Sequence, residues 1–220
     1  MMNDKRIVLL CGHYGSGKTN VAVNLALSLR NRYEKVTVAD LDIVNPYFRS
    51  KDSQEELERA GIRLICSAYA NTNVDIPALP QELYAITDDV SHRVVIDVGG
   101  DDRGALALGR ISPAILGEGD YEMLLVINCY RPLTRDAEST LEVMHEIETA
   151  CKIRFTGLVN NSNLGAETTE EDVLSSLKYA EEVSSLTGLP VMMTAVHESL
   201  YDALADKIPH PFALHLQKKI

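Results

Sequence analysis

A short glycine-rich segment constrains the fold of this chain more than any other part of its sequence. It reads Gly12-His13-Tyr14-Gly15-Ser16-Gly17-Lys18-Thr19 and follows an apolar, β-branched run at residues 6–11. Apolar residues with helical spacing follow it at once, which predicts a helix over residues 18–32. A buried strand, a glycine turn and a helix in direct succession are the parts of a βα unit and favour a parallel sheet.

Similar units recur along the rest of the chain. Several apolar runs are continuous rather than alternating, as expected for strands covered on both faces, and each connection is long enough for a crossover helix. The sequence therefore predicts an α/β fold with a three-layer, doubly wound, mostly parallel sheet. Further strands are expected at residues 35–41, 62–66, 93–98, 122–128, 154–160 and 190–195, and further helices at 53–60, 81–88, 104–116, 135–151, 169–187 and 199–205.

Composition narrows the class of protein. Hydrophobic residues make up 45% of the 220-residue chain and charged residues 24%, which excludes a disordered chain. No repeat, low-complexity linker or shift in composition divides it, so we expect one domain over residues 1–220. The net charge of −11 would repel a phosphate backbone and disfavours nucleic-acid binding.

No apolar stretch reaches the length of a membrane span, and no signal peptide is recognisable, so we expect a cytoplasmic protein. The segment at residues 211–220 has weak amphipathic character and two lysines, but it is short, and we do not expect it to bind a membrane. Three of the cysteines, Cys11, Cys66 and Cys129, lie in or beside apolar runs, which with Cys151 indicates reduced thiols rather than disulfides.

The glycine-rich segment satisfies the pattern GxxxxGK[ST] between a strand and a helix. Glycines let backbone N–H groups surround phosphate oxygens, and the helix N-terminus adds its positive dipole end. Lys18 can span the β- and γ-phosphates, and the Thr19 hydroxyl can ligate Mg²⁺. The segment predicts a nucleoside triphosphate bound with Mg²⁺ by Gly12, His13, Tyr14, Gly15, Ser16, Gly17, Lys18, Thr19 and the adjoining Asn20.

Two further predicted strands end in aspartates. Asp40 and Asp42 lie at the end of the second strand, and Asp97 ends a later strand, followed by Gly99 and Gly100. At the carboxyl edge of the sheet, one carboxylate can anchor Mg²⁺ and another can position an attacking water, while the backbone N–H of Gly100 can meet a γ-phosphate. An aspartate at such a position can also simply begin a loop or cap a helix.

Together these motifs resemble the P-loop branch that contains the MinD/ParA-type ATPases, the signal-recognition GTPases and the nickel-insertion ATPases, over nearly the whole chain. The resemblance implies a P-loop NTPase fold, a catalytic Asp42 aided by Lys18 and Asp40, and Mg²⁺ held by Thr19, Asp40 and Asp97. It also implies that Asn161 reads the adenine edge, although Asn161 could equally be an ordinary loop residue. The guanine-reading motif NKxD of the GTPase relatives is absent, which favours ATP.

One position departs from the MinD/ParA pattern. His13 replaces the signature lysine, which in family dimers reaches the phosphates of the partner subunit. An imidazole is shorter and mostly neutral at pH 7, so either another cation substitutes or turnover is slow. Arg49, Arg103 and Arg131 follow predicted strand ends and are the candidates, although each could also be a solvated surface arginine.

Three functions fit these observations. The first is a Mg²⁺-dependent ATPase that acts as a nucleotide-controlled switch on an unidentified partner protein and can form a homodimer. The second is an ATP-dependent ligase or kinase for a small molecule, and the third is a nucleotide-binding module without useful hydrolysis. No residue pattern names a small substrate, so the switch is the leading hypothesis.

Overall fold

In the part of the chain that the structure describes, the fold is built on one sheet of eight parallel strands. The computed structural model describes residues 5–41, 54–66, 81–100 and 102–216. The strands lie in the order β3-β2-β4-β1-β5-β6-β7-β8. Their bounds are β1 (Ile7–Cys11), β2 (Val36–Asp40), β3 (Arg63–Cys66), β4 (Arg93–Asp97), β5 (Tyr121–Ile127), β6 (Gly157–Asn160), β7 (Val191–His197) and β8 (Pro211–Leu214).

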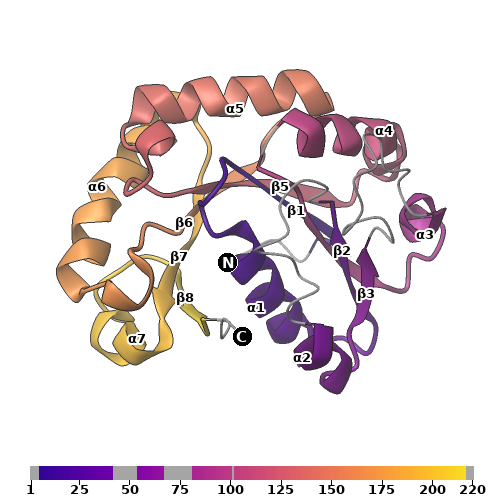
Figure 1. The fold of residues 1–220 in the computed structure, drawn as a ribbon, viewed down its shortest axis with the longest axis horizontal. Helices are drawn as coiled ribbons and strands as arrows, with labels where there is room; N and C mark the ends of the chain where they lie inside the picture. The colour runs from indigo at the N-terminus through magenta and orange to yellow at the C-terminus, as the bar shows by residue number, and fades with distance from the viewer. Residues whose placement is uncertain (1–4, 42–53, 67–80, 101, 217–220) are drawn as a thin grey trace, which may run out of the picture.

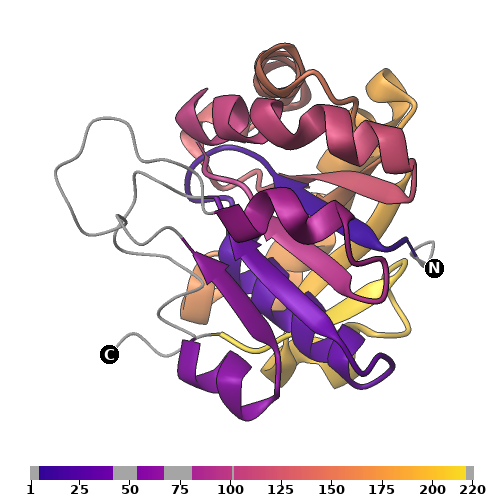
Figure 2. The ribbon, with the colours of Figure 1, turned by 90° about the vertical axis from the view of Figure 1, so that its right-hand side faces the viewer.

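Helices cover both faces of this sheet, as Figures 1 and 2 show. One face carries α4 and α5, and α1 lies across the other. The arrangement confirms the predicted three-layer α/β fold. The helices are α1 (Lys18–Arg30), α2 (Gln54–Arg59), α3 (Gln81–Tyr84), α4 (Asp102–Glu118), α5 (Ala137–Cys151), α6 (Glu170–Thr187) and α7 (Glu198–Leu204).

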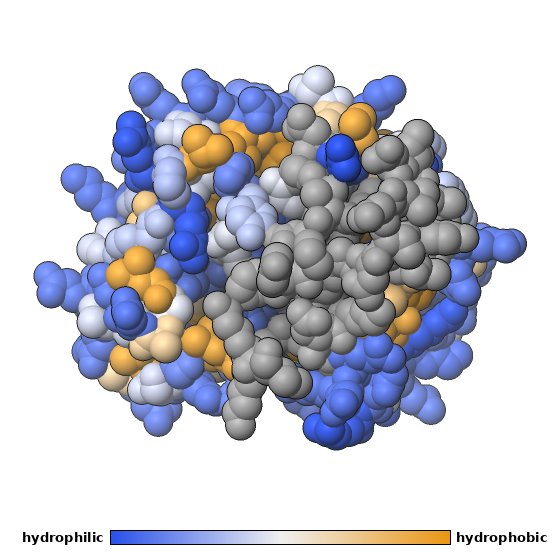
Figure 3. Space-filling view, in the orientation of Figure 1, coloured by the Kyte–Doolittle hydropathy of each residue, from blue (hydrophilic) through white to orange (hydrophobic). Residues whose placement is uncertain are grey.

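The central strand β1 shows why the apolar runs are continuous. Ile7, Leu9 and Cys11 belong to the core on the α4 and α5 side, whereas Val8 and Leu10 belong to the core on the α1 side. Successive side chains of a strand point to opposite faces, so a strand covered on both faces has no position for a polar residue. Hydrophilic residues occupy most of the coloured surface in Figure 3.

Some boundaries differ from the predictions. The predicted helix over residues 81–88 is the short α3 followed by a 3₁₀ turn at Ala85–Thr87. Helix α6 is capped by Thr169, whose hydroxyl pairs with Asp172 in a capping box. Residues 211–214 form an eighth strand beside β7, which the sequence pattern did not indicate because the run begins with Pro211, a residue disfavoured inside strands. Among the described residues, no helix is both long and apolar enough to cross a lipid bilayer.

Candidate functional site

The glycine-rich segment forms a tight loop between β1 and α1. Gly15 and Gly17 have φ values of 80° and 86°, in the left-handed region that favours glycine. Gly12 also has a positive φ, and a Cβ there would lie 2.5 Å from the carbonyl oxygen of Val126 in β5. The predicted turn is therefore present, and the packing of the neighbouring strand requires glycine at its first position.

Lys18, the first residue of α1, turns its side chain back across the loop. Its Nζ atom donates a hydrogen bond to the carbonyl oxygen of His13 at 3.2 Å, and only 7% of the residue is exposed. The loop also closes through the backbone N–H of Ser16, which donates to the same carbonyl at 3.1 Å. A buried ammonium is therefore held against a backbone carbonyl of the loop, and its positive charge suits an anionic ligand.

Ser16 adds a second polar group inside the loop. The residue is fully buried, and its Oγ atom has no hydrogen-bond partner among the described residues. An unpaired buried hydroxyl is unfavourable, since most buried polar groups in proteins are hydrogen-bonded. A ligand with acceptor oxygens would satisfy the hydrogen-bonding capacity of this hydroxyl.

Two of the predicted aspartates lie side by side at the carboxyl edge of the sheet. Asp40 ends β2 and is the register partner of Asp97, which ends β4. Both carboxylates are buried, and the hydroxyl of Thr19 donates to Oδ2 of Asp97 at 2.7 Å. The sheet thus brings Thr19, Asp40 and Asp97 to one edge, whereas Asp42 lies outside the described residues.

This donor set fits Mg²⁺ better than a metal that needs a full protein cage. Within the described ranges, no group of three or more His, Cys, Asp or Glu is placed to hold a metal ion. Mg²⁺ usually keeps several waters and is bound through one or two carboxylates together with phosphates of the substrate. Thr19 with Asp97, and Asp40 beside them, supply oxygens of that kind.

Gly100 lies directly against the phosphate-binding loop. A Cβ at this residue would lie 2.6 Å from the backbone nitrogen of Tyr14 and 2.8 Å from Nζ of Lys18. Gly100 is separated from Asp97 by two residues and precedes α4, so this contact joins the loop to the segment that leads into α4. The role of the Gly100 backbone N–H at a γ-phosphate stays a prediction.

Asn161 follows β6 and contacts the same loop from another side. Its Nδ2 atom donates to the carbonyl oxygen of Ser16 at 2.6 Å, and the residue is 1% exposed. A Cβ at Gly17 would lie 2.3 Å from this Nδ2 atom, so Gly17 must lack a side chain for Asn161 to fit. The role of Asn161 at an adenine edge stays a prediction, while its contact with Ser16 is a structural role that the sequence did not indicate.

Arg131 is a further residue at the loop. It follows β5, and its Nε atom donates to the carbonyl oxygen of Gly15 at 2.8 Å. Of the other arginines considered from the sequence, Arg103 is exposed on α4, and Arg49 lies outside the described residues. The motif pattern marked Arg131 only as one of several candidates, because a contact between residues so far apart leaves no local signal.

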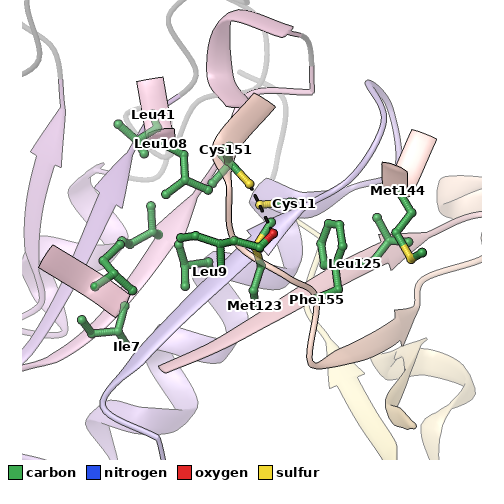
Figure 4. Packing of buried hydrophobic residues seen from close by; sticks show 14 of the residues in the cluster. Ile7, Leu9, Cys11, Leu41, Leu108, Met123, Leu125, Met144, Cys151 and Phe155 are labelled. Carbon is green, nitrogen blue, oxygen red and sulfur yellow. Dashed lines mark hydrogen bonds between the residues drawn. The ribbon is translucent and has the colours of Figure 1, made fainter. Parts of the chain in front are cut away.

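The residue before the loop, Cys11, is enclosed by apolar side chains. Figure 4 shows its thiol and that of Cys151 pointing toward each other beside Leu9 and Met123. Burial raises the pKa of the Cys11 thiol well above its ordinary value, and the nearby Cys151 raises it further. Cys11 is therefore a packing residue beneath the loop, and all the cysteines are free thiols, as predicted.

Comparison with known proteins identifies a family. The family of CobQ/CobB/MinD/ParA nucleotide binding domains matches residues 7–204 of this chain. None of the curated proteins matches it.

Solved structures of FtsY have a similar fold. FtsY from Mycoplasma mycoides is 18% identical with a TM-score of 0.55, covering 88% of this chain and 60% of the FtsY chain. The cell division protein FtsY from Thermotoga maritima is 17% identical with a TM-score of 0.55, covering 89% of this chain and 63% of its own. The signal recognition particle receptor FtsY from Elizabethkingia anophelis, solved in complex with GDP, is 16% identical with a TM-score of 0.54, covering 89% and 58%. This chain spans about three fifths of these FtsY chains, and at such identities the likeness concerns the fold.

Proposed function

The chain belongs to the family of CobQ/CobB/MinD/ParA nucleotide binding domains, and on that premise we propose that it is a Mg²⁺-dependent ATPase whose nucleotide state controls its affinity for a partner protein. The observation that carries the proposal is the convergence of Lys18, the Thr19–Asp97 hydrogen bond and Gly100 on one loop. These groups come from the N-terminus of α1, the end of β4 and the segment that follows β4, and their chemistry suits a phosphate chain with a divalent cation.

Each residue has a role in this proposal. Lys18 binds the phosphate oxygens through its ammonium group, while the backbone N–H groups of the loop surround them. Thr19, Asp40 and Asp97 hold Mg²⁺, which when bound neutralises charge on the phosphate oxygens. Asp42 orients the attacking water, a role that rests on the family resemblance and falls outside the described residues.

The contact of Gly100 supports a switch rather than a simple binding module. Gly100 abuts both Lys18 and Tyr14, so a ligand that moves the Lys18 ammonium acts directly on the segment leading into α4. Segments that respond to a γ-phosphate in this way change shape between triphosphate and diphosphate states in other P-loop switches. We propose that the partner protein recognises this segment, and that co-purification in ATP and in ADP recovers the partner in only one of the two states.

The proposal is tested with Lys18→Ala, with Lys178→Ala as the control because Lys178 is an exposed lysine on α6. A hydrogen bond to a charged group contributes about 1.5–3 kcal/mol, so Lys18→Ala is expected to weaken Mg²⁺-ATP binding by about 10- to 100-fold. Isothermal titration measures the affinity, and phosphate release in buffer alone measures hydrolysis. Unchanged binding in Lys18→Ala contradicts the site assignment.

The same assay separates the ATPase from other reactions. Hydrolysis in buffer alone supports the proposal. Phosphate release or transfer that requires an added small carboxylic acid or alcohol would instead indicate a ligase or kinase. Tight ATP binding without phosphate release would indicate a binding module.

A further inference from the structure

The phosphate-binding loop lacks a permanent positive charge at its second position. His13 stands there, and its Nδ1 atom pairs with the carbonyl oxygen of Tyr14 at 2.9 Å. An imidazole engaged with the backbone in this way provides no permanent cation toward a phosphate. The transition state of phosphoryl transfer gathers negative charge, and cations supplied to it contribute strongly to the rate.

Arg131 places a guanidinium at the rim of the same loop. Its Nε–H donates to the Gly15 carbonyl at 2.8 Å, which leaves the two terminal nitrogens for another acceptor. No ion pair joins Arg131 to a carboxylate of the described residues, in contrast to Arg6, which pairs with Glu118, and Arg154, which pairs with Glu148. The hydrogen bond to Gly15 places the charge of Arg131 where it can act on an anion at the loop.

The backbone that carries Arg131 is fixed by buried polar groups. The carbonyl oxygen of Asn128 accepts from the Arg131 N–H at 3.2 Å and from the Thr134 hydroxyl at 2.8 Å. Asn128 and Thr134 are 1% and 2% exposed. Pro132 follows directly, and the Tyr130 hydroxyl donates to the carbonyl oxygen of Asp172 on α6 at 2.9 Å. These hydrogen bonds fix the position of the turn, because the carbonyl of Asn128 lies in the interior, where water competes little.

We propose that Arg131 supplies, within the same chain, the positive charge at the phosphate-binding loop that His13 does not, and that it makes the site prefer a nucleoside triphosphate over a diphosphate. The inference rests on the proposed function, since it assumes a nucleotide at this loop. Arg131 contacts Gly15 through Nε alone, so its remaining donors and its charge act on the bound phosphates, while the Nε hydrogen bond sets where the guanidinium lies.

The experiment separates charge from hydrogen bonding. Arg131→Gln keeps a neutral donor, Arg131→Lys keeps the charge, and Arg131→Ala keeps neither. Arg135→Ala is the control, because Arg135 lies on the same segment but is exposed and paired with Asp136. The dissociation constants for the slowly hydrolysed analogue ATPγS and for ADP are measured with Mg²⁺ for each variant, after circular dichroism has verified folding.

We expect Arg131→Ala and Arg131→Gln to weaken ATPγS binding by about tenfold more than ADP binding, as for one charge-assisted contact. Arg131→Lys should retain most of the preference for ATPγS, and Arg135→Ala should match wild type. Equal losses for both nucleotides, full rescue by Gln, or no change in any variant overturns the inference alone. If wild-type protein bound neither nucleotide, the proposed function would fail as well.

Discussion

At the scale of single residues, Gly100 at the site and Gly117 away from it differ in what a side chain would meet. A Cβ at Gly117 in α4 would have no atom within 4 Å outside the helix backbone, whereas a Cβ at Gly100 would lie 2.6 Å from the Tyr14 backbone nitrogen. A contact that short cannot be relieved by turning a flexible side chain, because the atom belongs to the backbone. The two positions therefore form a matched pair for substitution.

We expect Gly100→Ala to weaken Mg²⁺-ATP binding by about tenfold or more, since shifting the Tyr14 backbone and the Lys18 ammonium loosens the phosphate contacts. Gly117→Ala should leave affinity unchanged and stabilise the fold slightly, because alanine favours a helix over glycine. Nucleotide titration and thermal unfolding measure the two effects. Wild-type affinity in Gly100→Ala would show that Gly100 can withdraw from the loop without consequence.

Other single residues of the site were predictable from local pattern. Lys18 and Thr19 follow from the spacing of the glycine motif, and Asp40 and Asp97 follow from their places at strand ends. Such signals lie within a few residues of one another along the chain. The hydrogen bond between Asn161 and Ser16 joins residues 145 apart, and the one between Arg131 and Gly15 joins residues 116 apart, so neither leaves a mark in a single sequence.

At the scale of elements, Asn161 in the loop after β6 has two candidate roles. Its amide holds the carbonyl of Ser16, whereas the family resemblance assigns it to the adenine edge. The two roles have different consequences for base preference. A residue that only supports the loop affects every nucleotide alike, and one that reads a base edge affects adenine and guanine nucleotides differently.

We expect Asn161→Ala to weaken ATP and GTP binding by a similar factor of about 5 to 100, because a buried carbonyl left unpaired costs about 1–3 kcal/mol. Asn31→Ala, at the exposed C-terminal end of α1, serves as the control. Competition between the two nucleotides against a fluorescent analogue gives the ratio directly. A loss confined to ATP would instead establish the adenine contact.

Element boundaries were less predictable than element types. The strands and long helices carry strong apolar periodicity, and all the predicted ones are present. Strand β8 has four residues and begins with Pro211, so its membership of the sheet depends on pairing with β7 rather than on its own composition. The start of α5 likewise depends on Asp136, whose carboxylate caps the Ser139 N–H.

At the scale of the whole molecule, the substitution at position 13 bears on self-association. The family resemblance attributes nucleotide-bound dimers to a lysine that crosses between subunits, and an imidazole at position 13 is shorter than lysine and carries no permanent charge. The net charge of −11 adds repulsion between two copies of the chain. We therefore expect the wild-type protein to sediment alike in ATP, in ADP and without nucleotide.

His13→Lys should introduce ATP-dependent association or raise turnover, because it places a permanent charge beside the loop. His145→Lys, an equal change in charge at an exposed position of α5, is the control. Sedimentation velocity and phosphate release measure both effects. A wild-type dimer that forms in ATP and survives His13→Ala with unchanged turnover would contradict this expectation.

The hydrogen bond from Asn161 to Ser16, two residues far apart in the sequence, has a consequence for the order of events during synthesis. The loop at residues 12–19 leaves the ribosome early, but the amide that holds Ser16 follows 145 residues later. At about 5–20 residues per second, that interval lasts roughly 7 to 30 s. Strand β1 also cannot pair within the sheet until β4 and β5, which flank it, have been synthesised. A nascent chain therefore carries its phosphate-binding motif for many seconds before it can close around a nucleotide.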